Sequence, residues 1–136
     1  MTPTGQARGT DLHAAMPFTG LLGATALAVD PAEVRLRLDW APERCTAGGV
    51  LHGGALMGLA DAAGGLCAHL NLPEGATSTA TISSASNFLR AVREGHVEAV
   101  ARPLNTGRTV IVVDTELRDA ADRLVARVTQ TQAVRR

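Results

Sequence analysis

The stretch Gly48–Gly65, GGVLHGGALMGLADAAGG, contains the start of the one long helix that the sequence predicts. This helix should run from Gly54 to about Leu70. Its residues are apolar almost all round, which is typical of a buried helix rather than of a helix on the surface. It carries a single carboxylate, Asp61, which we therefore expect to be buried. An unpaired buried charge is costly, so this residue needs a physical explanation.

The helical neighbours of Asp61 include no cation that could neutralise it. They stand three and four residues away and are Met57, Gly58, Gly64 and Gly65. Each glycine costs about 1 kcal/mol relative to alanine in a helix interior, so something must approach this face closely. Two interpretations stay open: close packing of a partner helix, across which Asp61 forms a hydrogen bond, or a cleft that admits a substrate. Both hold if the cleft lies at a dimer interface.

The start of the same helix carries a second candidate group, formed by His52, Gly53 and Gly54. The first amides of a helix lack internal partners and bind carbonyl or anionic oxygens, and glycine lets a ligand come close to them. A helix start beside a histidine resembles an oxyanion site. The alternative is a glycine-rich loop in which His52 is an ordinary hydrogen-bonding residue.

Distance decides how these two groups could act together. Gly53 and Asp61 are eight residues apart, which is about 12 Å along a helix. One chain cannot bring both within about 3 Å of a single carbonyl. A two-fold dimer could do so, by pairing the helix start of one chain with Asp61 of the other. If the residues share a site, the protein must be at least a dimer.

The remaining chain predicts an α+β fold. Asp11 should cap a short helix that runs to Met16 and ends at Pro17, after ten flexible residues. A first strand should lie within Leu21–Asp30, followed by EVRLRLDW, whose strict alternation predicts a half-buried strand. After the long helix come four further strands, at about 77–89, 96–102, 109–117 and 124–134.

The segments REG, NTG and DAAD between these later strands are short turns typical of hairpins, which predicts an antiparallel meander of four strands. Two strands, one buried helix and then this meander suit the hotdog fold, in which a curved sheet wraps a central helix.

Composition excludes several functional classes. The 136 residues have a formal net charge of zero and 2% aromatic residues, which argues against nucleic acid and anionic lipid as partners. Every cation is arginine, so Schiff-base chemistry and a Walker phosphate loop are excluded. The histidines and two cysteines have no spacing typical of a metal site, and Cys67 should be inert core. With no signal peptide and no membrane span, we expect a cytoplasmic protein.

The run HGGALMGLAD resembles the motif of hotdog-fold acyl-CoA thioesterases, including the phenylacetate-pathway, 4-hydroxybenzoyl-CoA and 1,4-dihydroxy-2-naphthoyl-CoA enzymes. The resemblance continues through NFLRAVREGHVEAVARPLNTGRT and DRLVARVTQT. It implies a single domain over residues 1–136 that hydrolyses an acyl-CoA, with an aryl or medium-chain acyl group, as a homodimer or a dimer of dimers. It implies no cofactor, since coenzyme A is part of the substrate.

The resemblance also implies roles for individual residues. Asp61 would be the catalytic carboxylate, either as nucleophile or as general base toward water, while the Gly53 amide polarises the thioester carbonyl and His52 orients the group. The expected substrate- and coenzyme-binding residues are Gly54, Thr46, Gly65, Asn87, Arg90 and Arg108.

Two of these positions depart from the family pattern. Many relatives carry Gln or Asn where this chain has Thr46, and those of the hydroxybenzoyl and naphthoyl types often have Ser or Thr where this chain has Gly65. The alternative function is therefore a hotdog protein that binds acyl-CoA without turnover. A dehydratase acting on enoyl thioesters is a third option, which the spacing of His52 and Asp61 disfavours.

Overall fold

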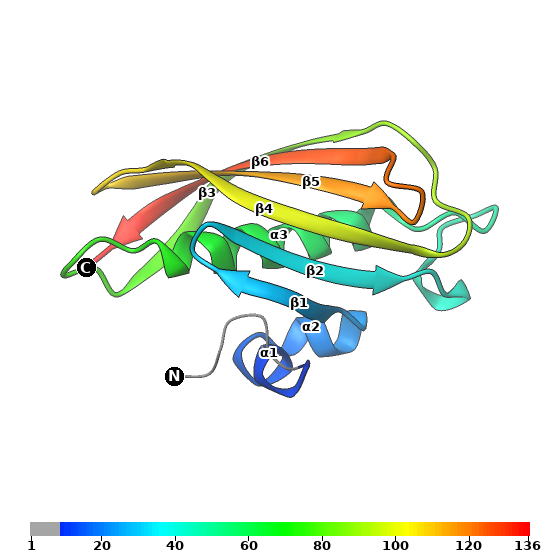
Figure 1. The fold of residues 1–136 in the computed structure, drawn as a ribbon, viewed down its shortest axis with the longest axis horizontal. Helices are drawn as coiled ribbons and strands as arrows, with labels where there is room; N and C mark the ends of the chain where they lie inside the picture. The colour runs from blue at the N-terminus through cyan, green and yellow to red at the C-terminus, as the bar shows by residue number, and fades with distance from the viewer. Residues whose placement is uncertain (1–8) are drawn as a thin grey trace.

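The computed structural model describes residues 9–136 (Figure 1). Within these residues, three α-helices, a short 3-10 helix and six strands follow one another. In order they are α1 (Gly9–Ala15), α2 (Pro17–Leu22), β1 (Thr25–Asp30), β2 (Glu33–Asp39), η2 (Pro42–Arg44), α3 (Gly53–Leu70), β3 (Ser78–Phe88), β4 (His96–Thr106), β5 (Val110–Asp119) and β6 (Leu124–Arg135).

The six strands form one sheet in the order β1-β2-β4-β5-β6-β3, and every neighbouring pair is antiparallel. The sheet curves around α3, which lies along its inner side, while α1 and α2 pack below β1 (Figure 1). One antiparallel sheet around one long helix confirms the predicted α+β class.

The predicted meander of four strands is wrong at β3. This strand pairs with β6 at the far edge of the sheet rather than with β4. The segment that contains REG is therefore a crossover and not a hairpin. It packs back onto the approach to α3, because the Leu51 amide donates to the Val92 carbonyl at 2.9 Å and the Val92 side chain is buried. Only β4, β5 and β6 form a meander.

The N-terminal helices also differ from the prediction. Helix α1 begins at Gly9, so Asp11 lies in its first turn instead of capping it, and the helix ends at Ala15. The predicted flexible segment falls on residues 1–8, outside the described residues, and on the first two residues of this helix. A carboxylate in the first turn still favours the helix, because it faces the positive end of the helix dipole.

Pro17 opens a second helix instead of ending the first. It occupies a first-turn position of α2, where a missing N–H costs nothing. Leu21 therefore lies in α2, and the first strand starts later than predicted, at Thr25. The turn between them uses Gly23, whose φ of 91° is the left-handed conformation that glycine adopts without strain.

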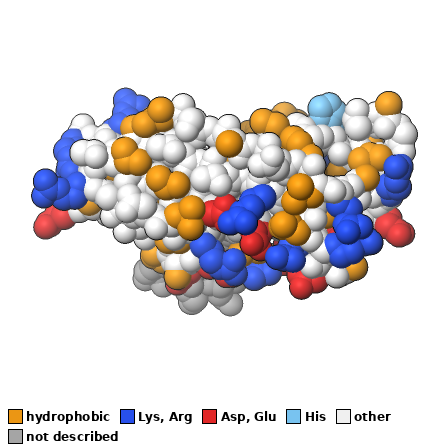
Figure 2. All heavy atoms as spheres, turned by 90° about the horizontal axis from the view of Figure 1, so that it is seen from above, with side chains coloured by type: hydrophobic (Ala, Val, Ile, Leu, Met, Phe, Trp, Pro, Cys, Tyr) orange, Lys and Arg blue, Asp and Glu red, His pale blue; other side chains and the backbone are white. Residues whose placement is uncertain are grey.

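Strand β3 is one of the two edges of the sheet. It has no charged residue, no strand within residues 9–136 lies beside its outer edge, and Ile82 and Phe88 are 63% and 50% exposed. Figure 2 shows the molecule from above Figure 1, and hydrophobic and uncharged side chains cover most of the upper part of this view. Long apolar edge strands are normally covered by another chain or element.

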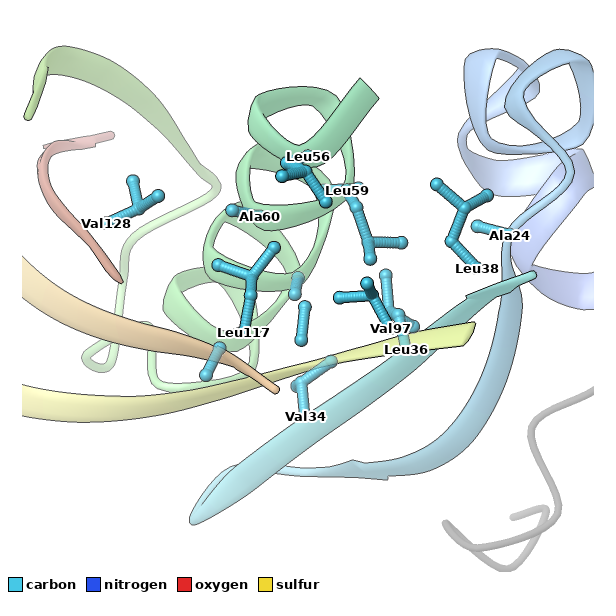
Figure 3. Packing of buried hydrophobic residues seen from close by; sticks show 14 of the residues in the cluster. Ala24, Val34, Leu36, Leu38, Leu56, Leu59, Ala60, Val97, Leu117 and Val128 are labelled. Carbon is cyan, nitrogen blue, oxygen red and sulfur yellow. The ribbon is translucent and has the colours of Figure 1, made fainter. Parts of the chain in front are cut away.

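The core lies between α3 and the inner face of the sheet. The alternation predicted for β2 is confirmed, since Val34, Leu36 and Leu38 are fully buried and the residues between them are not. Figure 3 shows these side chains pointing toward Leu56 and Leu59 of α3. Burial of such side chains contributes about 1.5–3 kcal/mol each, which explains why an apolar helix needs the sheet around it.

Leu59 tests this packing. It is fully buried, so Leu59→Ala should lower the free energy of unfolding by about 2–5 kcal/mol through lost burial and the cavity left behind. Urea unfolding at one fixed protein concentration measures this difference. Leu21→Ala is the control, since that side chain is 85% exposed, and its effect should stay within about 0.5 kcal/mol. Equal effects of the two substitutions would contradict the packing described here.

Candidate active site

The start of α3 presents a free backbone amide. His52 is the N-cap residue, with φ −63° and ψ 136°, and its Nδ1 accepts a hydrogen bond from the Gly54 amide at 2.8 Å. The Gly54 amide is thus occupied by the cap. The Gly53 amide has no hydrogen-bond partner within residues 9–136 and points out from the helix start. Since Nδ1 is the acceptor, the neutral imidazole carries its proton on Nε2.

A groove of about 350 Å³ lies beside this amide. Thr46, Gly53 and Arg90, three of the predicted site residues, line it together with Leu56 and Phe88. The Phe88 ring lies close to Gly53, because a Cβ added there would sit 3.4 Å from the ring Cζ. The structure thus places apolar side chains, Thr46 and Arg90 along the groove beside the free amide.

The other side of the helix start faces a second groove, of about 570 Å³. His52 and Gly54 line it with Arg44 and Cys45, and apolar side chains of α2 close it. The Arg44 side chain is not free there, since its Nε donates to the Leu22 carbonyl at 2.6 Å and its Nη1 to the Asp39 carbonyl at 3.0 Å. Residues 52–54 therefore separate two grooves.

Asp61 is exposed, and the prediction that it is buried is wrong for the single chain. The sheet covers one side of α3 and this carboxylate lies on the side left open. Its Oδ1 accepts a hydrogen bond from Gln130 Nε2, on β6, at 3.2 Å. Within the described part of the chain no arginine forms an ion pair with it.

The glycines around Asp61 have three different environments. Gly58 packs against Phe18 of α2, which a Cβ would approach to 3.0 Å, and Gly64 is covered by the Gln130 side chain, which a Cβ would displace. A Cβ on Gly65 would meet nothing within 4 Å. Close packing, by side chains rather than by a partner helix, therefore explains two of the glycines. The third leaves open space beside Asp61, at the rim of a groove of about 310 Å³.

The remaining predicted residues are spread over the molecule. Asn87 is exposed on β3. Arg90 lies near the start of α3, whereas Arg108 lies in the β4–β5 turn at the opposite end of the long axis (Figure 1). The Arg108 carbonyl accepts from Arg136 Nη2 at 3.0 Å. A single chain does not bring these two arginines to one ligand.

Two residues near Asp61 were missed by the sequence analysis, Gln130 and Gln132. Both are buried, at 0% and 1% exposure, on the inward face of β6. Their position in the alternation of β6 could have revealed them. Every second residue of this strand faces the core, and the two glutamines continue the row begun by Ala126 and Val128.

In the part of the chain that the structure describes, no three His, Cys, Asp or Glu side chains gather into a possible metal site. No helix within residues 9–136 is long and apolar enough to cross a membrane. Cys67 lies in the core, and desolvation by burial raises the pKa of its thiol to about 11. The prediction of a buried core cysteine is confirmed.

Comparison with known proteins now decides the family. The model of the thioesterase superfamily matches residues 48–126, more than half of the chain. The matched segment contains α3, the crossover and the strands β3, β4 and β5. The chain belongs to the thioesterase superfamily.

Solved structures of this superfamily share the fold. A Pseudomonas aeruginosa thioesterase, solved as a mutant, superposes with a TM-score of 0.86 at 28% identity over 98% of this chain and 95% of that one. The phenylacetic acid degradation protein PaaI of Thermus thermophilus, also a mutant, gives a TM-score of 0.79 at 27% identity over 88% and 99%. The predicted hotdog fold is confirmed.

Among relatives by sequence, the 1,4-dihydroxy-2-naphthoyl-CoA hydrolase of Escherichia coli is 34% identical over 86 residues, which are 63% of this chain and 62% of that enzyme. In several curated relatives, the region that matches this chain covers about three-fifths of the relative's own length.

The two thiols should differ in reactivity. At pH 8 a thiol with a pKa of about 11 carries roughly one thiolate per thousand molecules, and the thiolate is the reactive form, so Cys67 should react with a disulfide reagent at least about 100-fold more slowly than Cys45, which is half-buried. The rate at Cys67 should rise with pH toward 11. Cys45→Ala should remove the fast phase of the native protein, and urea should expose a second thiol. A fast phase that survives Cys45→Ala would contradict this assignment.

Proposed function

We propose that this protein hydrolyses an acyl-CoA thioester to a free acid and coenzyme A. The observation that carries the proposal is the start of α3, where the His52 cap occupies the Gly54 amide and leaves the Gly53 amide free beside a groove. Such a donor binds the oxygen of a thioester carbonyl and stabilises the negative charge that develops on it. Membership of the thioesterase superfamily supports this reaction class.

Asp61 supplies the carboxylate of the proposed reaction. As a general base it takes a proton from water, whose oxygen attacks the carbonyl carbon. As a nucleophile it attacks that carbon itself, and water then hydrolyses the resulting anhydride. In both routes the C–S bond breaks, the thiolate of coenzyme A leaves and takes up a proton, and the acid is released. Coenzyme A enters as part of the substrate, so the proposed reaction needs no separate cofactor.

The site is proposed to form between two copies of the chain. Gly53 and Asp61 both lie on α3, eight residues apart, which is about 12 Å along the helix axis. The uncharged, exposed edge of β3 is the surface by which a second copy would bind, since antiparallel pairing of β3 with its own copy satisfies the free backbone groups of both.

Antiparallel pairing of β3 with its own copy would also bring the Gly53 amide of one chain toward the Asp61 side of α3 in the other. It places the Phe88 end of one strand beside the Ser78 end of the other. The Phe88 end lies at the Gly53 groove, and the Ser78 end lies at the groove lined by Gly65, one turn beyond Asp61. The free amide of one copy would thus face the open side of α3 in the other.

The proposed acyl group is aryl or medium-chain. The apolar wall of Leu56 and Phe88 beside Gly53 suits such a group, and the relatives named for naphthoyl-CoA and phenylacetic acid favour an aromatic acid. Arg90 of one copy and Arg108 of another are the proposed phosphate contacts, since the guanidinium fork matches phosphate oxygens. A dimer of dimers would let two arginines at opposite ends of the chain reach one coenzyme.

The roles of Asp61 and Gly53 can be tested by release of free thiol from a panel of aryl and medium-chain acyl-CoA esters. Asp61→Asn should lower kcat by about 10²–10⁴-fold, because it removes the base or nucleophile. Gly53→Pro should lower kcat by about 10²–10³-fold, because it removes the N–H donor. Proline fits the first helical position, and the ψ of His52 is compatible with a following proline.

Gly53→Ala is the matched control, since it adds a side chain but keeps the N–H; it should lose less than about tenfold. A wild type no faster than Asp61→Asn on every ester would end the hydrolase proposal and leave the alternative, a protein that binds acyl-CoA without turnover.

Mixing two inactive variants tests whether the site is shared between chains. If Asp61 of one copy acts with Gly53 of another, a mixed dimer of Asp61→Asn and Gly53→Pro contains one intact site of two. Because half of the dimers are mixed, co-expressed chains should recover about a quarter of wild-type activity. Size-exclusion chromatography of each variant checks that both still assemble, and no recovery from assembled mixed dimers would place both groups in one chain.

A further inference from the structure

A chain of hydrogen bonds runs from the edge of the sheet to Asp61 through two buried amides. Gln132 Nε2 donates to Thr81 Oγ1 at 2.7 Å and to Gln130 Oε1 at 3.0 Å. Gln130 Nε2 donates to Asp61 Oδ1 at 3.2 Å and contacts the Ala60 carbonyl at 3.5 Å. The chain thus connects β3, β6 and α3.

The direction of these bonds is set by the carboxylate. An ionised carboxylate only accepts, so Gln130 must present its NH₂ to Asp61 and its oxygen to Gln132. Gln132 must then donate with its own NH₂, both to Gln130 and to the Thr81 hydroxyl. The orientation of each side-chain amide therefore determines that of the next one. Exchanging the oxygen and the NH₂ of either glutamine would break at least one of these hydrogen bonds.

Burying the Gln130 amide costs free energy that an apolar side chain would not, which argues against a purely structural role for this residue. Its side chain is fully buried, in a row whose preceding members, Ala126 and Val128, are apolar. A buried amide costs free energy unless its groups are hydrogen-bonded, and its partner here is an exposed carboxylate. Gly64 provides the space, since any Cβ at that position would collide with the Gln130 carboxamide.

We propose that Gln130 is a positioning residue that holds the Asp61 carboxylate in its reactive orientation. This inference rests on the proposed function, in which Asp61 is the catalytic group. An exposed aspartate on a helix is free to rotate about its side-chain bonds. The hydrogen bond from Gln130 fixes Oδ1 and leaves Oδ2 as the free oxygen of an exposed carboxylate. Gln132 fixes Gln130 in turn, and Thr81 extends the network to the edge strand.

The closing experiment replaces Gln130 by an unbranched apolar residue of similar length. Gln130→Met should lower kcat by about tenfold or more through loss of a hydrogen bond to a charged group, while KM changes by less than about threefold, because the buried side chain does not touch the substrate. Gln132→Met should cause a smaller loss of kcat. Circular dichroism and size-exclusion chromatography establish that each variant is folded and assembled.

Thr115→Val is the matched control for changing a buried polar side chain. Thr115 is fully buried on the neighbouring strand β5 and its hydroxyl has no hydrogen-bond partner among the described residues. Its replacement by valine should leave kcat within about twofold of the wild type.

A double variant separates positioning from a general loss of fold quality. In the Asp61→Asn background, Gln130→Met should lower the remaining rate by less than about twofold, because the group it positions is already gone. A tenfold loss in that background too, or a folded Gln130→Met variant with wild-type kcat beside an inactive Asp61→Asn variant, would overturn the role of Gln130 and leave the proposed function intact. Wild-type activity of Asp61→Asn itself would instead overturn the proposed function.

Discussion

The packing of α3 against the inner face of the sheet is the interaction on which the rest of the structure depends. The helix has no polar stripe of its own, so it is stable only where apolar strands cover it. The sheet covers one side, with Leu59 and Ala60 fully buried against it. The start of the helix and the side that carries Asp61 remain uncovered. The proposed reactive groups thus stand on a rigid element while staying open to a ligand.

The sequence predicted the elements whose signal is local. The strict alternation of β2 and the apolar run of α3 each determine one element without reference to any other. The pairing of β3 could not be predicted in this way, because it depends on the arrangement of the other strands, which leaves one edge of β6 free to pair with it. Pro17 shows the same limit, since proline either ends a helix or occupies its first turn, and only the surrounding chain decides which.

The candidate site was predictable to a similar extent. The HGG motif indicated a helix start with free amides, and the structure places that start at Gly53, one residue earlier than predicted. The cap made by His52 on the Gly54 amide was not predicted. The prediction that Asp61 is buried was wrong. The apolar composition of the helix indicates that the helix as a whole packs in the interior, but it does not indicate which side of the helix the sheet leaves open. The alternation of β6 could have shown that Gln130 faces the core, but its contact with Asp61, 69 residues away, is one that no local pattern reveals.

The position of β3 also has a consequence for how the chain folds. Phe88 pairs with Ala126, and Ser78 with Arg135 near the end of the chain. A ribosome adds about 5–20 residues per second, so β3 emerges seconds before β6 exists to receive it. During that interval an uncharged strand and an apolar helix are both exposed, and contacts so distant in sequence form slowly. Synthesis of β6, rather than any earlier local event, closes the sheet.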